Sequence, residues 1–87
     1  MRVDYAKLFI RQLRKCPPKI QLAFRKRLEL FVINQFHPLL NCHSLHGRLA
    51  GYKSINVTGD WRALFREFED RRLIYFEMIG THSELYE

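Results

Sequence analysis

The residues best suited to chemistry in this chain are histidines and an aspartate that stand close to the ends of strand-like runs. Asp60, with Trp61 beside it, begins one such run, and His82 follows another. His43 lies in a loop further upstream. A histidine exchanges protons near neutral pH, and an aspartate beside it can hold one tautomer. This set of residue types therefore predicts general acid–base chemistry.

The net charge of the chain favours a polyanion as the substrate of this chemistry. The sequence has 87 residues and a net charge of +6. Residues 1–35 hold nine Lys and Arg against two acids, and residues 36–87 hold six against seven. A basic surface attracts nucleic acid by counterion release, although a solvated helix face has the same composition. RNA carries its own nucleophile, the 2′-hydroxyl, so RNA cleavage is a natural use of acid, base and cation.

A metal-binding site is an alternative role for one of the same histidines. His37, Cys42, His43 and His46 lie within ten residues, and histidine and cysteine are zinc ligands. Their spacing matches no compact zinc finger, and there is no second cysteine pair. The sequence also lacks a nucleophile elbow, a phosphate loop and a dinucleotide fingerprint. We therefore expect no metal and no cofactor.

Two helices are predicted in the first 35 residues. Apolar residues recur at helical spacing between residues 5 and 15, and Cys16-Pro17-Pro18 ends that helix. Pro18 suits the first turn of a second helix, which runs to about residue 35. Together they predict a helical hairpin with one apolar side, and residues 2–4 could form a short first strand.

Three strand-like runs rich in aromatic and β-branched residues follow a loop over residues 36–51. They cover residues 52–57, 61–68 and 72–79. Short polar turns between the runs predict an antiparallel meander, with Phe65, Tyr75 and Phe76 in the core. We therefore expect residues 1–87 to form one α+β domain, a helical hairpin packed on a small antiparallel sheet.

The meander predicts that the chemical groups meet at one edge of the sheet. Its second and third strands run antiparallel, so Asp60 and Trp61 at the start of one lie beside His82 at the end of the other. Gly80 is expected to end the third strand sharply, with Tyr86 close by in the tail. The structural alternative is that Asp60 shapes a turn, Trp61 belongs to the core and His82 caps the chain end.

Two stretches of the second half resemble a family of bacterial toxins. The segments HSLHGRLAGYKSINVTGDWRALFRE and IGTHSELY are similar to the RelE/ParE superfamily of toxin–antitoxin pairs, most closely to its YafQ-like branch. The likeness covers residues 43–86, and the first 35 residues share only the helical plan. It implies a RelE-like fold and an mRNA endonuclease that acts on the ribosome without a metal, by attack of the 2′-hydroxyl on the adjacent phosphate.

The resemblance also implies roles for particular residues. Those implied to be catalytic are His43, Asp60, Trp61, His82 and Tyr86. Those implied to contact RNA are Arg48, Lys53 and Asn56. His82 would be the principal proton-transfer residue, with His43 and Asp60 sharing base and orienting roles. The branch usually has a histidine where this chain has Asn56, and asparagine forms hydrogen bonds but does not exchange protons near pH 7.

The implied partners are a cognate antitoxin, the ribosome and mRNA. A complex of the two proteins would bind promoter DNA through the antitoxin. No signal peptide or membrane span is predicted, so we expect a cytoplasmic protein with no membrane partner. Two other functions stay open: a ParE-like gyrase-inhibiting toxin, and a catalytically inactive module that binds ribosomes or RNA. The acid–base cluster argues against the first, and Asn56 keeps the second open.

Overall fold

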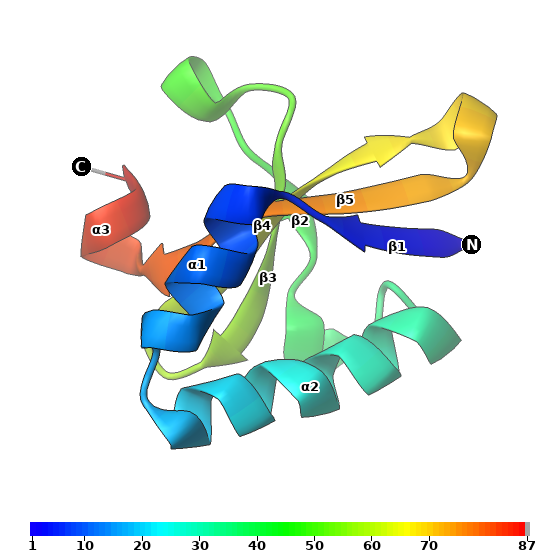
Figure 1. The fold of residues 1–87 in the computed structure, drawn as a ribbon. Coiled ribbons are helices and arrows are strands. Elements are labelled where there is room, and N and C mark those ends of the chain that lie inside the picture. Colours follow the sequence, from blue (N-terminus) through cyan, green and yellow to red (C-terminus); the bar gives the residue numbers. More distant parts are fainter. Residues whose placement is uncertain (87) are drawn as a thin grey trace.

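The computed structural model describes residues 1–86 and contains one five-stranded sheet with two long helices on one face (Figure 1). The strands are β1 (Arg2–Tyr5), β2 (His43–Ser44), β3 (Lys53–Thr58), β4 (Trp61–Phe68) and β5 (Leu73–Thr81). The helices are α1 (Lys7–Lys15), α2 (Pro18–Ile33) and α3 (His82–Tyr86), with 3-10 turns η1 (Pro38–Leu40), η2 (Gly47–Leu49) and η3 (Glu69–Arg71). The predicted α+β class is confirmed.

The order of strands across the sheet is β1-β5-β4-β3-β2. Strands β3, β4 and β5 form the predicted antiparallel meander. Strand β2 lies in the segment predicted as a loop, where His43 and Ser44 pair antiparallel with β3. The predicted short first strand is β1, which pairs in parallel with β5 and places Val3 opposite Ile74. The sheet is therefore mixed rather than purely antiparallel, because the chain passes through both long helices between β1 and the meander.

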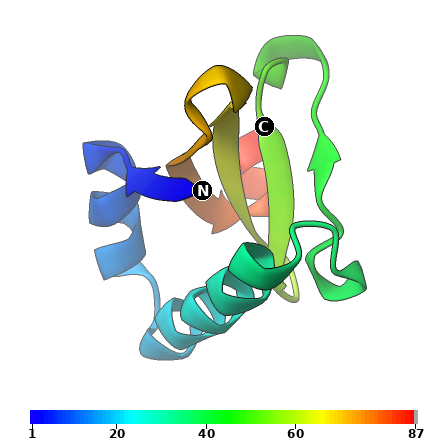
Figure 2. The ribbon, with the colours of Figure 1, turned by 90° about the vertical axis from the view of Figure 1, so that its right-hand side faces the viewer.

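The two long helices cover the same sheet face but diverge from their junction at Cys16 and Pro17 (Figure 1, Figure 2). Helix α1 lies against β5, and α2 lies against β3. The predicted hairpin is thus an open one, in which each helix packs on the sheet. No helix within residues 1–86 combines the length and apolarity needed to cross a bilayer.

Phenylalanines from both helices and two strands form the centre of the core. They are Phe9, Phe24, Phe31, Phe65 and Phe76, all at most 2% exposed. The ring centroid of Phe76 lies 5.3 to 5.9 Å from those of the other four. Tyr75, which was also predicted in the core, is instead half-buried on the opposite face. Successive strand residues point to opposite faces, so Tyr75 cannot share a face with Phe76.

The chain end folds back onto the sheet as α3, which the sequence analysis did not predict. Strand β5 continues through Gly80 to Thr81, so the prediction that Gly80 ends the strand is wrong. Gly80 instead allows close packing, since a Cβ there would lie 3.1 Å from Oε1 of Glu84. The Thr81 amide donates to Oε1 of Glu84 at 2.8 Å, and the Glu84 amide donates to Oγ1 of Thr81 at 3.3 Å. This reciprocal capping box satisfies amides at the start of α3.

Candidate functional site

The sheet face opposite the long helices, here called the open face, aligns residues from four strands. Residues paired directly across a ladder share a face. One row on this face consists of His43, Ser54, Leu64 and Met78. The next row, nearer to α3, consists of Asn56, Arg62 and Gly80. The alternation of strand residues thus presents a histidine, an asparagine and an arginine on one surface.

A pocket of about 360 Å³ collects the polar groups of this face. It is lined by Asn41, His43, Leu45, Arg62, His82 and Tyr86, and we call it the histidine pocket. Two of the predicted histidines and the predicted tyrosine therefore share one pocket, although they come from β2 and α3. Arg62 adds a cation to the same pocket. This combination can move protons beside a phosphate and stabilise its negative charge.

The turn before β2 holds the His43 ring in one tautomer. Asn41 has a left-handed backbone, with φ of 44°. The Nδ1–H of His43 donates to the carbonyl oxygen of Asn41, with 2.7 Å between nitrogen and oxygen. Because a carbonyl oxygen only accepts, Nδ1 carries the proton and Nε2 of the neutral ring has a free lone pair. The geometry thus prepares His43 to accept a proton at Nε2.

Helix α3 holds His82 and Tyr86 side by side. Their rings meet edge to face, with centroids 4.4 Å apart. Residues four apart on a helix are neighbours, so even this short helix brings the two rings together. The Tyr86 hydroxyl donates to Oγ of the fully buried Ser54 at 3.1 Å, and Arg48 donates to the Tyr86 carbonyl at 3.4 Å. These contacts attach the helix to the open face and to the η2 loop.

Arg62 and Asn56 are neighbours across the ladder between β4 and β3. Nη1 of Arg62 donates to the carbonyls of Gly59 and Trp61 at 2.8 and 3.0 Å, which orients the guanidinium. These bonds use one of its three nitrogens. Oδ1 of Asn56 is buried and has no hydrogen-bond partner within residues 1–86. A buried acceptor without a partner costs about 1–3 kcal/mol.

Asp60 and Trp61 reach the predicted edge of the sheet through their backbones. The His82 amide donates to the Asp60 carbonyl at 2.9 Å, and Trp61 pairs with Thr81. Their side chains, however, line another pocket together with Lys19 of α2. Trp61 is half-buried against the core, and Asp60 makes no ion pair within residues 1–86. The structure therefore places both side chains apart from the histidine pocket.

Lys53 also faces away from the open face. Its ladder partner is the core residue Phe65, and its Nζ donates to Oε1 of Glu67 at 2.8 Å. This hydrogen bond raises the pKa of Lys53 and lowers the pKa of Glu67. Gln35 donates to the same oxygen at 3.2 Å. The predicted contact of Lys53 with RNA thus has no support from its placement, on the side of the sheet that the helices cover.

Solved structures share this architecture over nearly the whole chain. YafQ from E. coli matches with a TM-score of 0.68 at 23% identity, covering 100% of both chains. The toxin–antitoxin complex RelBE2 from Mycobacterium tuberculosis matches with a TM-score of 0.71 at 24% identity, covering 93% of this chain and 96% of the other. A YoeB/ParE toxin from Agrobacterium tumefaciens matches with a TM-score of 0.77 at 15% identity, covering 94% and 99%. This chain has the fold of the RelE/ParE toxins.

The RelE-like fold predicted from the sequence is thereby confirmed. No protein-family model matches the sequence, and no curated protein matches it. The likeness is therefore one of three-dimensional arrangement.

Within the RelE-like fold, Arg62 is the pocket residue that the sequence analysis missed. A signal for it was present, because Arg62 directly follows Trp61 in a predicted strand. If Trp61 packs toward the core, alternation places Arg62 on the other face. Leu45 and Asn41 were also missed, because the loop over residues 36–51 has no periodic pattern from which to place them.

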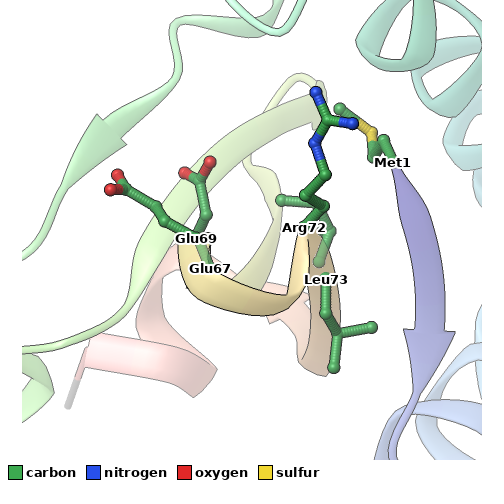
Figure 3. A pocket seen from close by; sticks show the side chains of 6 residues that line it. Met1, Glu67, Glu69, Arg72 and Leu73 are labelled. Carbon is green, nitrogen blue, oxygen red and sulfur yellow. The ribbon is translucent and has the colours of Figure 1, made fainter.

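A second pocket of about 360 Å³ lies at the far end of β4 (Figure 3). Its lining residues are Met1, Glu67, Glu69, Arg72, Leu73 and Ile74. Glu67 and Glu69 extend from one side of it and Arg72 from the other (Figure 3). Two carboxylates repel a polyanion, so this pocket is a poorer candidate for RNA than the histidine pocket.

The residues that raised the question of a zinc site do not gather. Nδ1 of His37 accepts a hydrogen bond from the Leu39 amide at 3.2 Å and caps η1. Cys42 accepts a hydrogen bond from Gln35, and burial raises the pKa of its thiol. In the part of the chain that the structure describes, no three or more His, Cys, Asp or Glu residues are arranged to hold a metal ion.

Proposed function

We propose that this chain is the toxin of a toxin–antitoxin pair and an endoribonuclease that cleaves mRNA on the ribosome in the cytoplasm. The observation that carries the proposal is the histidine pocket, in which two histidines, an arginine and a tyrosine share one face of the sheet. The RelE-like fold and the sequence resemblance support the same class of activity. The net charge of +6 favours a polyanionic substrate.

The proposed reaction begins with His43 as the general base. Its Nε2 accepts the proton of a ribose 2′-hydroxyl, and the 2′-oxygen attacks the adjacent phosphorus. The bond from phosphorus to the 5′-oxygen breaks, which leaves a 2′,3′-cyclic phosphate. His82 in its protonated form gives a proton to the departing 5′-oxygen. Arg62 stabilises the negative charge that builds on the phosphate oxygens.

Other residues of the predicted site would bind or position. Asn56 would contact RNA beside Arg62, its neighbour across the ladder, and the ring of Tyr86 would stack on a base. Arg48 on η2 would contact a phosphate beside the pocket. Asp60 would act through its carbonyl, which holds the first residue of α3 at 2.9 Å. Trp61 would support the same edge from the core side.

We also propose a cognate antitoxin as the partner that covers the end of α2. RelBE2, which shares the fold, is a toxin–antitoxin complex. Val32, Ile33, Phe36 and Leu39 are 55%, 85%, 71% and 56% exposed. Apolar residues gathered on a surface in this way are typical of a protein interface. Arg25 and Lys26, exposed on the same helix, favour an acidic segment of the antitoxin, and the complex would bind promoter DNA through it.

The deciding experiment maps the 5′ ends of transcripts after induced expression. The wild type is expected to arrest growth and create new mRNA ends, and His82→Ala is expected to do neither. Purified ribosomes carrying a defined mRNA test the same cleavage directly. Growth arrest with intact transcripts and a DNA-damage response would favour the gyrase-inhibiting toxin instead. Ribosome binding without new ends would favour the inactive module.

A further inference from the structure

A cluster of Tyr52, Arg66 and Glu77 lies on the open face next to the histidine pocket. Leu45 lines that pocket, and its amide donates to the Tyr52 carbonyl at 2.9 Å. Tyr52 stands two residues before Ser54, so alternation places both on the same face. Arg66 likewise stands two residues after Leu64. The cluster is therefore one row, roughly 7 Å, further along the face than His43.

Glu77 joins this cluster from a β-bulge in β5. The register between β4 and β5 shifts after the pair of Leu64 with Met78, and the next pair is Phe65 with Phe76. Glu77 is the extra residue, and a bulge re-aims the side chain that it carries. Its carboxylate lies 2.7 Å from Nε of Arg66 and accepts a hydrogen bond from the Tyr52 hydroxyl at 3.2 Å.

The cluster holds the Arg66 guanidinium beside an aromatic ring. The Cζ atom of Arg66 lies 4.4 Å from the centroid of the Tyr52 ring. In the plane of the guanidinium, Nε faces Glu77 and Nη2 donates to the Tyr52 hydroxyl at 2.9 Å. The Arg66 side chain is nevertheless 44% exposed, so part of it is accessible to a ligand, beside its half-buried ladder partner Tyr75.

These contacts favour a nucleobase over a phosphate as that ligand. Arginine recognises phosphate through its in-plane donors, and two of those nitrogens are already engaged here. Glu77 also offsets the positive charge that would attract a phosphate. Unstacked RNA bases, by contrast, stack on guanidinium planes and on aromatic rings. The Arg66 guanidinium beside the Tyr52 ring supplies groups of both kinds.

We propose that Arg66 on Tyr52 is a stacking subsite for the base next to the cleaved bond, with Glu77 holding the platform in place. The subsite rests on the proposed ribonuclease function, because its neighbour is the histidine pocket. It positions the RNA and takes no part in proton transfer. It also provides a contact through which the protein can discriminate among the bases beside the cleavage site.

The test measures binding of the non-cleaving His82→Ala protein to ribosomes that carry a short mRNA. Arg66→Ala in this background is expected to weaken binding about tenfold, the usual order for one stacked base. An mRNA that lacks the flanking base is expected to weaken binding of the parent by a similar factor. It should have little further effect on the Arg66→Ala protein, because both changes remove the same contact.

Arg71→Ala is the matched control, because Arg71 also lies over an aromatic ring, with its Cζ atom 5.9 Å from the Phe68 centroid, further along β4 from the histidine pocket than Arg66. It should leave binding unchanged. Arg66→Lys keeps the charge without the plane and should bind as weakly as Arg66→Ala. Full binding by the lysine variant, or equal sensitivity of Arg66→Ala and its parent to the missing base, overturns the subsite. If the wild type does not cleave mRNA, the proposed function is wrong. The binding measurement still tests the stacking subsite in that case.

Discussion

The hydroxyl of Tyr86 donates a hydrogen bond of 3.1 Å to Oγ of Ser54, and Ser54 is fully buried in the middle of the sheet. This bond attaches the last helix to the row that also holds His43. The same helix carries His82, whose ring centroid lies 4.4 Å from that of Tyr86. One hydrogen bond therefore helps to set the distance between the two histidines of the pocket.

Tyr86→Phe is expected to lower the free energy of unfolding by about 1–3 kcal/mol, because it leaves the buried Ser54 hydroxyl without a partner. Urea unfolding measures the change. Ser54→Ala combined with Tyr86→Phe removes both partners and should cost less than the sum of the single changes. Additive losses would show that the two hydroxyls do not interact.

Replacing either pocket histidine is expected to slow cleavage of ribosome-bound mRNA. His43→Ala and His82→Ala should each reduce kcat about 100- to 10,000-fold, since each removes a proton-transfer group. Circular dichroism should show an unchanged fold, because both side chains are exposed. A His43→Ala protein that cleaves at the wild-type rate would exclude His43 as the base.

Arg62 and Lys53 are expected to differ sharply, although both are cations on neighbouring strands. Arg62→Ala removes the cation of the histidine pocket and should reduce kcat about 100- to 1,000-fold. Lys53→Ala acts on the other side of the sheet and should change kcat less than about threefold, a small effect beside that of a transition-state contact. Single-turnover cleavage compares the two directly. A larger loss in Lys53→Ala than in Arg62→Ala would contradict this assignment of the cations.

The Lys53–Glu67 pair predicts a specific dependence of stability on pH. The hydrogen bond from Lys53 lowers the pKa of Glu67 below its ordinary value of 4.5. The ionised carboxylate therefore stabilises the fold above pH 4.5, and this contribution is lost as the pH falls through the lower folded-state pKa. Glu67→Gln should lower Tm at neutral pH and flatten its decline between about pH 5 and pH 3.

Glu69→Gln is the control for that measurement, because Glu69 is an exposed carboxylate in the same pocket (Figure 3). It should lower Tm less than Glu67→Gln does, because the hydrogen bond from Lys53 goes to Glu67. The raised pKa of Lys53 makes a separate contribution, which is present below 10.5 and is lost only as the pH rises through the folded-state value. A Glu67→Gln profile parallel to that of the wild type would mean that the pair does not couple to folding.

Charge substitutions at the end of α2 test the proposed antitoxin surface. Ile33→Asp and Phe36→Asp should weaken binding of the proposed antitoxin at least about 30-fold, the scale of an interface hot spot. Both side chains are more than 70% exposed, so Tm should change little. Leu22→Asp is the control, since Leu22 is 52% exposed on the same helix but nearly three turns away. Equal loss in all three variants would point to a general charge effect.

Local patterns in the chain were sufficient for much of the fold. Apolar spacing and the proline pair located both long helices, and alternation with polar turns located β3, β4 and β5. The direction of the strands alone also predicted that Asp60 lies close to His82. The His82 amide donates a hydrogen bond of 2.9 Å to the Asp60 carbonyl. These features depend on contacts between residues that are near in sequence or in adjacent strands. The spacing of apolar and polar residues along the chain is enough to predict such contacts.

The parts that were missed depend on contacts between distant segments or on an irregularity within one strand. The parallel pairing of β1 with β5 joins the two ends of the chain, and no local signal specifies it. The bulge at Glu77 leaves two successive residues, Glu77 and Met78, on the same face of an otherwise regular strand. The continuation of β5 through Gly80 rests on its pairing with Arg62 of β4.

Composition, spacing and resemblance to a toxin family therefore established the class of fold and the set of residues worth testing. Tertiary structure alone decided which of them share a surface. A strand sends neighbouring side chains to opposite faces, so one step along β4 separates Trp61, packed on the core, from Arg62 in the histidine pocket. The same rule separates Lys53 from Ser54, and only the assembled sheet shows which face each one has.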